Sequence, residues 1–223
     1  KMAAYAYPMI NRYQQKNVTP HVQPTAFHFK FDKPYMIRSE GFRGYNHINF
    51  EKSILKRKGL TKQYFGMIDN LVFNRFLSRL PIDPEYKCLI VVASIKMARE
   101  LAAYLKGCYP DLEVNSFVED DPDSNAFNST ICVSTHQSSG TGLDIPKLAA
   151  VFMTVAIGSE QTNIQVQGRL RKLPTEGALH DFVYFVCDDI TAHTKYHLDK
   201  KNRIFKGKLL PVIDFDSNIV LEV

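Results

Sequence analysis

Residues 88–93 read Cys-Leu-Ile-Val-Val-Ala, and this apolar run decides the fold. An uninterrupted apolar run of this length is typical of a strand that is buried on both faces of a sheet. Ser94 follows directly. Residues 95–106 then predict a helix with one apolar face, made of Met97, Ala98, Leu101, Ala102 and Leu105. The stretch therefore predicts a buried strand that leads through Ser94 into a covering helix.

The same alternation continues along the chain. Residues 113–118, 130–134, 149–155 and 182–187 predict further strands, and residues 161–172 and 190–202 predict helices. Residues 61–80 also have helical apolar spacing, with Thr61 as the expected N-cap. The acidic, turn-rich residues 119–128 predict a surface loop. This order predicts an α/β fold with a mostly parallel sheet and helices on both faces.

The first part of the chain lacks this regularity. Residues 1–24 carry scattered prolines and predict an irregular lead-in. Residues 25–31 predict a half-buried strand, because aromatic residues alternate there with His28 and Lys30. We assign residues 1–60 to a lead-in or interdomain segment and residues 61–223 to one α/β domain. Because the chain begins with Lys1 rather than Met, we expect it to be a piece of a longer protein.

The composition sets broad limits on function. The 223 residues are 45% hydrophobic, which is enough for a proper core. A net charge of +5 allows a polyanionic partner without requiring one. None of the four cysteines forms a C-x-x-C pair or a Cys/His cluster with zinc spacing, so we expect a reducing compartment and no metal site. The absence of a signal peptide and of a long apolar run predicts a soluble, cytoplasmic protein with no membrane partner.

Residues 165–172 read Gln-Val-Gln-Gly-Arg-Leu-Arg-Lys and follow the strand predicted at 149–155. In a helix, Gln165, Arg169 and Lys172 would share one face, and Arg171 would point away. An amide and a guanidinium that project together suit a phosphate oxyanion. The alternative is a solvated helix with basic residues on its outer side.

Residues 135–146 read Thr-His-Gln-Ser-Ser-Gly-Thr-Gly-Leu-Asp-Ile-Pro and also follow a strand. Gly140 and Gly142 would let the backbone pass close to a ligand, and Asp144 could accept a hydrogen bond from a ribose hydroxyl. The alternative is a Gly/Ser-rich surface turn. His136 is interpreted as a loop histidine, since no Ser/His/Asp order supports catalysis. Because ligands bind at the carboxyl ends of parallel strands, we expect Ser94 and both motifs at one edge of the sheet.

Two further features bear on polyanionic ligands. Basic residues gather before and at the start of the helix predicted at 61–80, and they suit either a nucleic-acid backbone or a solvated surface: Lys52, Lys56, Arg57, Lys58 and Lys62. The chain contains no G-x-x-x-x-G-K-[ST] phosphate loop and no Asp-Glu pair after a strand to hold Mg²⁺. If the chain handles ATP, it therefore supplies only part of the site. Asp188 and Asp189 are interpreted as a charge pair at a helix N-terminus rather than as a cation site.

Three segments, taken in order, resemble the second, C-terminal RecA-like domain of a superfamily-2 helicase. Residues 88–105 resemble motif IV, residues 131–146 motif V, and residues 165–172 motif VI, which is usually written Q-x-x-G-R-x-x-R. The similarity covers about residues 61–203. Within the family, the chain most resembles the compact helicases of large phages and DNA viruses. Residues 1–60 would then be the end of a missing first motor domain and the interdomain connection.

The resemblance implies roles for motif VI. Arg169 would be the arginine finger, and Gln165 would face the γ-phosphate of ATP bound to the other domain. Gly168 would belong to the same nucleotide-facing segment. The family's last arginine is replaced here by Lys172, whose point charge cannot make a bidentate fork. Arg171, beside Lys172, is the residue that could take the role of this arginine.

The resemblance also implies contacts elsewhere. Gly140, Gly142 and Asp144 would touch the nucleotide, whereas Ser94 and Thr135 would hold nucleic-acid phosphates together with Lys56, Arg57 and Lys58. ATP and Mg²⁺ would be bound mainly by the N-terminal RecA-like domain. The implied protein is an ATP-dependent helicase or translocase that acts on nucleic acid, with DNA favoured, in replication, repair or recombination. The chain alone should not hydrolyse ATP.

Two other functions are compatible with the fold. A non-enzymatic nucleic-acid-binding module would keep the sheet and bind through residues 52–62 without needing Arg169. A stand-alone α/β enzyme for a small ligand is disfavoured, because no convergent set of acid and base residues is found.

Overall fold

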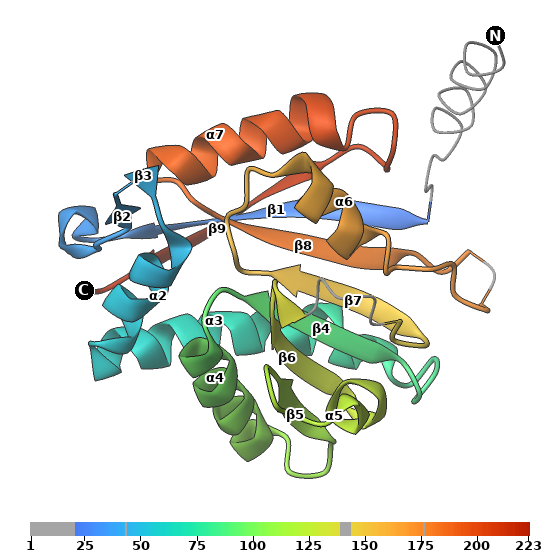
Figure 1. Cartoon of the computed structure of the whole chain (residues 1–223). Coiled ribbons are helices and arrows are strands. Elements are labelled where there is room, and N and C mark those ends of the chain that lie inside the picture. Colours follow the sequence, from blue (N-terminus) through green and yellow to red (C-terminus); the bar gives the residue numbers. More distant parts are fainter. Residues whose placement is uncertain (1–20, 43, 139–143, 176) are drawn as a thin grey trace, which may run out of the picture.

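A seven-stranded sheet forms the centre of the molecule in the computed structural model, which describes residues 21–42, 44–138, 144–175 and 177–223. The strand order is β5-β6-β4-β7-β8-β1-β9, and every neighbouring pair is parallel (Figure 1). The strands are β1 (Val22–Phe31), β4 (Lys87–Val92), β5 (Val114–Phe117), β6 (Ile131–Thr135), β7 (Leu148–Met153), β8 (His180–Cys187) and β9 (Ile213–Leu221). The predicted α/β fold with a mostly parallel sheet is confirmed.

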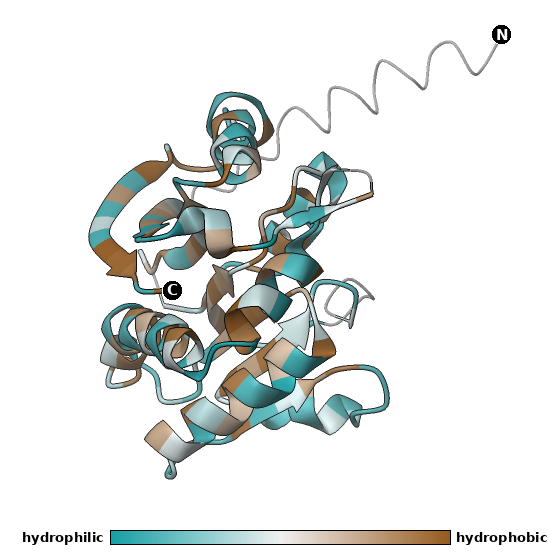
Figure 2. Ribbon diagram, turned by 90° about the vertical axis from the view of Figure 1, so that its left-hand side faces the viewer, coloured by the Kyte–Doolittle hydropathy of each residue, from teal (hydrophilic) through white to brown (hydrophobic). Residues whose placement is uncertain are grey.

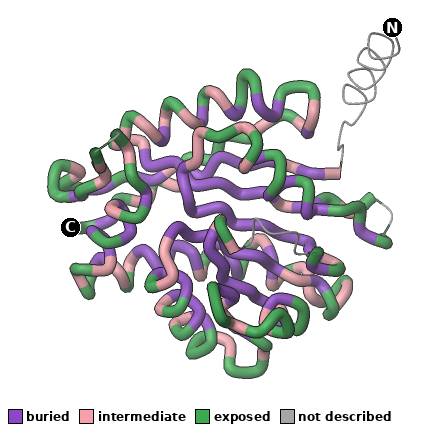
Figure 3. The backbone as a smooth tube through the Cα atoms, in the orientation of Figure 1, coloured by how far each residue is buried: buried purple, intermediate pink, exposed green. Residues whose placement is uncertain are grey.

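Helices cover both faces of the sheet. One face packs against α2 (His47–Leu55), α3 (Lys58–Arg75) and α4 (Ile95–Cys108). The other packs against α5 (Asp123–Asn128), α6 (Glu160–Gln167) and the π-helical turn η4 (Lys200–Ile204), which continues α7 (Thr191–Asp199). Two short 3-10 turns, η1 (Pro34–Met36) and η2 (Leu77–Arg79), and a small hairpin of β2 (Glu40–Gly41) and β3 (Gly44–Tyr45) complete the described elements. Figure 3 shows the buried strands enclosed by these helices.

The β4–α4 unit shows how local sequence produces this arrangement. Alternate residues of β4 belong to the two hydrophobic clusters, with Ile90 on the α3–α4 face and Val91 on the α6 face. Ser94 then caps α4, because its Oγ accepts a hydrogen bond from the Met97 N–H at 3.2 Å. The helix buries the five apolar residues expected from their spacing, so the strand and the helix are both confirmed.

The structure corrects the assignment of residues 1–60 for the part that it describes. The alternating stretch within 25–31 is confirmed as a strand, but it belongs to the ten-residue β1, an inner strand of the same sheet. β1 pairs with β8 on one side and with β9 on the other. Residues 22–55 are therefore structural parts of the α/β unit rather than a lead-in to it. Residues 1–20 lie outside the described residues.

Other boundaries also differ from the predictions. Helix α3 begins at Lys58, so Thr61 is not its N-cap; its hydroxyl instead donates to the Arg57 and Ile54 carbonyls at 3.0 Å. The acidic segment 119–128 contains α5 and is not only a loop. Strand β9 was missed, because an edge strand with exposed charged residues lacks a buried apolar run. Within the described parts of the chain, no helix is both long and apolar enough to cross a membrane.

Candidate functional site

Helix α6 carries the first half of the 165–172 segment. Ser159 caps it by accepting from the Thr162 N–H at 3.3 Å, and the helix ends at Gln167 with Gly168 as the C-cap. A Cβ on Gly168 would lie 3.1 Å from the Ile164 carbonyl oxygen, which favours glycine there. Because Arg169 follows the helix, the predicted helical face shared by Gln165, Arg169 and Lys172 is wrong. Gln165 is exposed and Arg169 is buried.

The two predicted ligand motifs do meet. The Arg171 Nη2 lies 3.0 Å from the Asp144 Oδ2, which ties the end of the 135–146 segment to the 165–172 segment. Burial lowers the pKa of Arg169, and the Asp144 charge opposes that shift. We call Asp144, Arg169 and Arg171 the arginine cluster. It places two guanidinium groups beside one carboxylate, a set that suits phosphate oxygens and a hydroxyl donor.

The other residues predicted from these two motifs make no contact that the structure describes with the arginine cluster. Lys172 is exposed next to Arg171. Gly140 and Gly142 lie outside the described residues. Their predicted contacts with nucleotide therefore stay predictions.

The arginine cluster lies at the opposite edge of the sheet from the one predicted. The Leu170 carbonyl is 3.0 Å from the Nε2 of His21, which directly precedes β1. Thr175 is hydrogen-bonded at 3.0 Å to Tyr86, which directly precedes β4. The reason is topological: α6 runs back across the sheet from the carboxyl end of β7 to the amino end of β8 (Figure 1). The structure thus separates the arginine cluster from Ser94 and Thr135, which follow or end their strands at the carboxyl edge.

At the carboxyl edge, the two predicted phosphate contacts serve the protein's own backbone. Ser94 caps α4 with its hydroxyl and donates its N–H to Glu51 at 2.8 Å. Thr135 ends β6, and its Oγ1 accepts from the Ser138 N–H at 3.2 Å in a tight turn. Contacts of Ser94 and Thr135 with nucleic acid therefore stay predictions.

A buried polar network at the same edge was missed by the sequence reasoning. The Glu51 carboxylate on α2 accepts hydrogen bonds from the Ala93 N–H at 2.6 Å and from the Ser94 N–H. Burial raises the pKa of Glu51 to about 7. Its neighbour His47, one helical turn earlier, accepts from the Ala156 N–H at 3.2 Å. Helix α2 is thereby fixed to the ends of β4 and β7.

Tyr45 extends this network to α7. The Tyr45 hydroxyl is hydrogen-bonded to the His47 Nδ1 and lies 2.6 Å from the His193 Nε2. The His193 Nδ1 accepts from the Cys187 N–H at 3.1 Å, so the Nε2 carries the proton and donates to Tyr45. We call Tyr45, His47, Glu51 and His193 the carboxyl-end brace. No local motif marks it, since its members are spread over 149 residues, from 45 to 193.

The basic residues predicted to contact nucleic acid, Lys56, Arg57 and Lys58, lie at the end of α2, the helix that carries His47 and Glu51 of the brace. Lys56 and Lys58 are exposed, as a contact with nucleic acid requires. Arg57 instead donates to the Ser53 carbonyl at 3.0 Å and to the Met36 carbonyl at 3.2 Å, which gives it a structural role. Two exposed aromatic side chains stand nearby: Tyr35 beside Met36, and Phe42 at the tip of the β2–β3 hairpin. Figure 2 looks onto this side of the molecule, where the strands end.

Comparison with known proteins identifies the fold. No family model matches the chain, and no curated protein sequence matches it. The chain resembles domain 2 of the DEAD-box helicase Mss116p, in a structure bound to an RNA duplex, with a TM-score of 0.51 and 16% identity over 86% of this chain and 64% of that chain. It resembles S. cerevisiae Dbp5 L327V bound to RNA and ADP BeF3 with a TM-score of 0.55 and 16% identity over 91% of this chain and 43% of that chain. It resembles T4 UvsW with a TM-score of 0.58 and 10% identity over 88% and 42%.

The chain thus shares the RecA-like α/β fold of these structures, and the fold implied by the resemblance is confirmed. It spans less than two thirds of each of these chains, with 64% as the largest share. At 10 to 16% identity, the likeness establishes the fold, and the activity has to be argued from the site.

Proposed function

We propose that this chain is the second motor domain of an ATP-dependent nucleic-acid helicase or translocase. The observation that carries the proposal is the arginine cluster. Arg171, which follows α6, pairs with Asp144, and the charge of the same carboxylate also acts on Arg169. In the resemblance these are the segments that face a nucleotide, so the fold and the cluster support the same function.

The described residues fit part of a nucleotide site. Arg169 and Arg171 suit phosphate oxygens, and Asp144 suits a ribose hydroxyl. ATP and Mg²⁺ would be held mainly by a partner domain with a phosphate loop. Across the cleft, Arg169 would approach the γ-phosphate and stabilise the charge that develops during its transfer. Its burial favours this role, because a guanidinium in a partly desolvated place acts more strongly on a nearby anion.

The carboxyl edge would hold the nucleic acid. Lys56 and Lys58 suit backbone phosphates, and the exposed rings of Tyr35 and Phe42 suit stacking with unpaired bases. The carboxyl-end brace would keep these groups fixed relative to the sheet. Closing and opening of the two motor domains around ATP would then move this grip along a strand. DNA is the partner that the resemblance to phage and viral helicases implies, and a reducing cytoplasm fits the four free cysteines.

The test uses the protein joined to its phosphate-loop domain. Arg169→Ala should lower nucleic-acid-stimulated ATP hydrolysis by about 10³-fold or more, because it removes the arginine finger. ATP binding should persist, as measured with a fluorescent ATP analogue. Arg99→Ala, on the exposed side of α4, is the matched control and should leave the rate unchanged. An unchanged rate of nucleic-acid-stimulated ATP hydrolysis in Arg169→Ala would contradict the proposal.

The same preparation separates the proposal from a non-enzymatic binding module. Such a module would bind single-stranded and duplex DNA in a salt-dependent way through residues 52–62 and would not depend on Arg169. Titration of DNA and RNA against Arg169→Ala and against a Lys56→Ala/Lys58→Ala double variant measures this directly. The chain alone, which contains no phosphate loop, should hydrolyse no ATP, and measurable turnover by it would contradict the proposal.

A further inference from the structure

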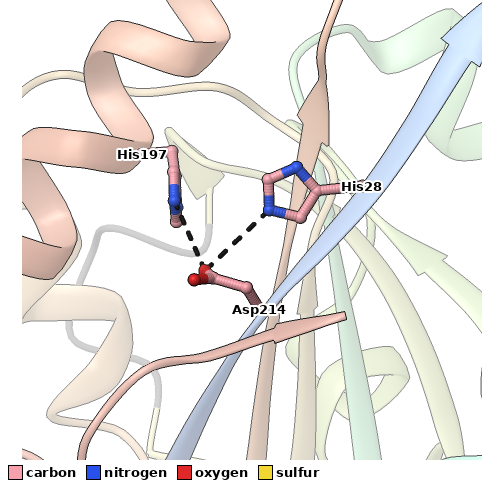
Figure 4. A group of neighbouring side chains, drawn as sticks. All are labelled: His28, His197 and Asp214. Carbon is pink, nitrogen blue, oxygen red and sulfur yellow. Dashed lines mark ion pairs between the residues drawn. The ribbon is translucent and has the colours of Figure 1, made fainter. Parts of the chain in front are cut away.

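Three side chains from separate elements converge beside the edge strand β9. His28 comes from β1, His197 from α7 and Asp214 from β9 (Figure 4). Their nitrogen and oxygen ligand atoms all lie within 4.8 Å of one another. The His28 Nε2 is 3.9 Å from the Asp214 Oδ1, and the His197 Nε2 is 3.4 Å from the same oxygen. Two imidazoles and one carboxylate are a ligand set that divalent transition metals favour.

The orientation of His28 is fixed from behind. Its Nδ1 is 2.7 Å from the Asp188 Oδ1, and because a carboxylate only accepts, Nδ1 is the donor. The other nitrogen, Nε2, then presents its lone pair to Asp214. Among the described residues this buried Nε2 has no hydrogen-bond partner. A carboxylate behind a histidine in this way is the arrangement that orients histidine ligands in metal sites.

His197 has a comparable support. Its Nδ1 is 2.9 Å from the Tyr184 hydroxyl, which leaves Nε2 on the side of Asp214. His197 is largely buried, with 9% of its side chain exposed, whereas Asp214 is 41% exposed. Two histidines held in the protein therefore face a carboxylate that is open to solvent. The open side leaves room for a water molecule as a further ligand.

The spacing of these atoms suits a metal ion better than a shared proton. A separation of 3.9 Å between the His28 Nε2 and the Asp214 Oδ1 is too long for a hydrogen bond. Two metal–ligand bonds of about 2.1 Å span roughly 3.4 to 3.9 Å between the ligand atoms, depending on the angle at the metal. The distances from the His28 Nε2 and the His197 Nε2 to the Asp214 Oδ1, 3.9 and 3.4 Å, already lie within this range.

We propose that His28, His197 and Asp214 form a zinc-type binding site that fastens β9 to β1 and α7. The site is independent of the proposed function, since it lies outside the arginine cluster and the carboxyl-end brace. Mg²⁺ is a poor fit, because it prefers all-oxygen ligands. One cation competes for the place: the Lys201 ammonium is paired with the Asp214 Oδ2. Removing a metal ligand should therefore weaken metal binding, and removing the Lys201 ammonium should strengthen it.

The experiment titrates Zn²⁺, and Co²⁺ as a spectroscopic probe, into the metal-free chain by calorimetry and visible absorption. We expect one ion per chain and a Co²⁺ spectrum with histidine coordination. His28→Gln or Asp214→Asn should weaken the affinity by more than about 100-fold, and Asp188→Asn by about 10- to 100-fold. Lys201→Ala should tighten it, because the competing ammonium is gone. Mg²⁺ should not displace the bound ion.

The control is His136→Gln, which removes a histidine at another place and should bind Zn²⁺ like the wild type. Thermal melts in a chelator show whether each variant is folded. Hydrogen exchange gives a second readout: added Zn²⁺ should slow exchange in β9 and leave β4 unchanged. No uptake of Zn²⁺ or Co²⁺ overturns the proposal. So does equal affinity in the wild type, His28→Gln and Asp214→Asn, since the ion would then sit elsewhere.

Discussion

The arginine cluster and the carboxyl-end brace occupy opposite edges of one sheet, and they are built differently. In the brace, Glu51, His47 and Tyr45 are paired with backbone N–H groups or with one another. In the arginine cluster, the Arg171–Asp144 pair is largely open to solvent, with 74% and 50% of the side chains exposed. The difference teaches that the brace satisfies buried polar groups of the fold, whereas the Arg171–Asp144 pair leaves its charges exposed to solvent.

The largest expected effect on stability is at the brace. Glu51→Ala leaves the buried Ala93 and Ser94 N–H groups without their acceptor, and each lost partner costs about 1 to 3 kcal/mol. We therefore expect the free energy of unfolding to fall by about 3 kcal/mol or more. Urea denaturation measures this change. Asp144→Ala is the matched control at the other edge, and an equal loss in both variants would remove the distinction between the two regions.

The brace should also make stability depend on pH. Burial raises the pKa of Glu51 from 4.5 to about 7, so the folded chain binds this proton more tightly than the unfolded chain. The stabilisation from this group is complete below pH 4.5 and is lost as the pH rises through about 7. Relative to Glu51→Gln, the wild type should lose up to about 3 kcal/mol between pH 4.5 and about 8. A difference between the two proteins that stays constant over this pH range would contradict the assignment.

A smaller effect is expected for the hydroxyl that joins α7 to the brace. Tyr45→Phe removes the group that bridges His47 and His193, while it keeps the ring. Losing these neutral hydrogen bonds should cost about 1 to 2 kcal/mol. Thermal unfolding measures this loss, and Tyr196→Phe is the matched tyrosine control. If Tyr45→Phe is as stable as the wild type, the bridge between α2 and α7 does not contribute to the fold.

The smallest effect on stability is expected at the arginine cluster. Arg171→Ala breaks an exposed ion pair, and such pairs contribute about 0.2 to 1 kcal/mol that salt screens further. The melting temperature should hardly change at high salt. If the proposed function holds, ATP hydrolysis by this variant also tests whether Arg171 takes the role that the resemblance gives to a second arginine. A large loss of stability would show that the cluster is a structural element instead.

Much of the fold was predictable because it rests on local patterns. The β4–α4 unit follows from an apolar run, a serine cap and helical spacing, all within residues 88–105. The strand pattern of β1 was also visible, but its place in the sheet was not. Alternation in a sequence shows which residues are buried, and it does not show which strands they lie between. Strand β9 alternates at residues 213–216, but Ile213 and Phe215 are exposed, so the pattern at this edge strand marks no buried face.

The candidate sites also have a part that the sequence predicted and a part that it did not. The sequence by itself contains the three segments in order, and their resemblance predicted the fold that the comparisons confirm. Only the tertiary structure decided that α6 ends before Arg169, that the arginine cluster and Ser94 lie at opposite edges, and that Glu51 occupies the N–H groups at the end of β4. It also brought His28, His197 and Asp214 together from positions 28 to 214. A motif can be predicted from sequence when its residues lie in one short segment. Residues that only the packing brings together are far apart along the chain, and no sequence pattern links them.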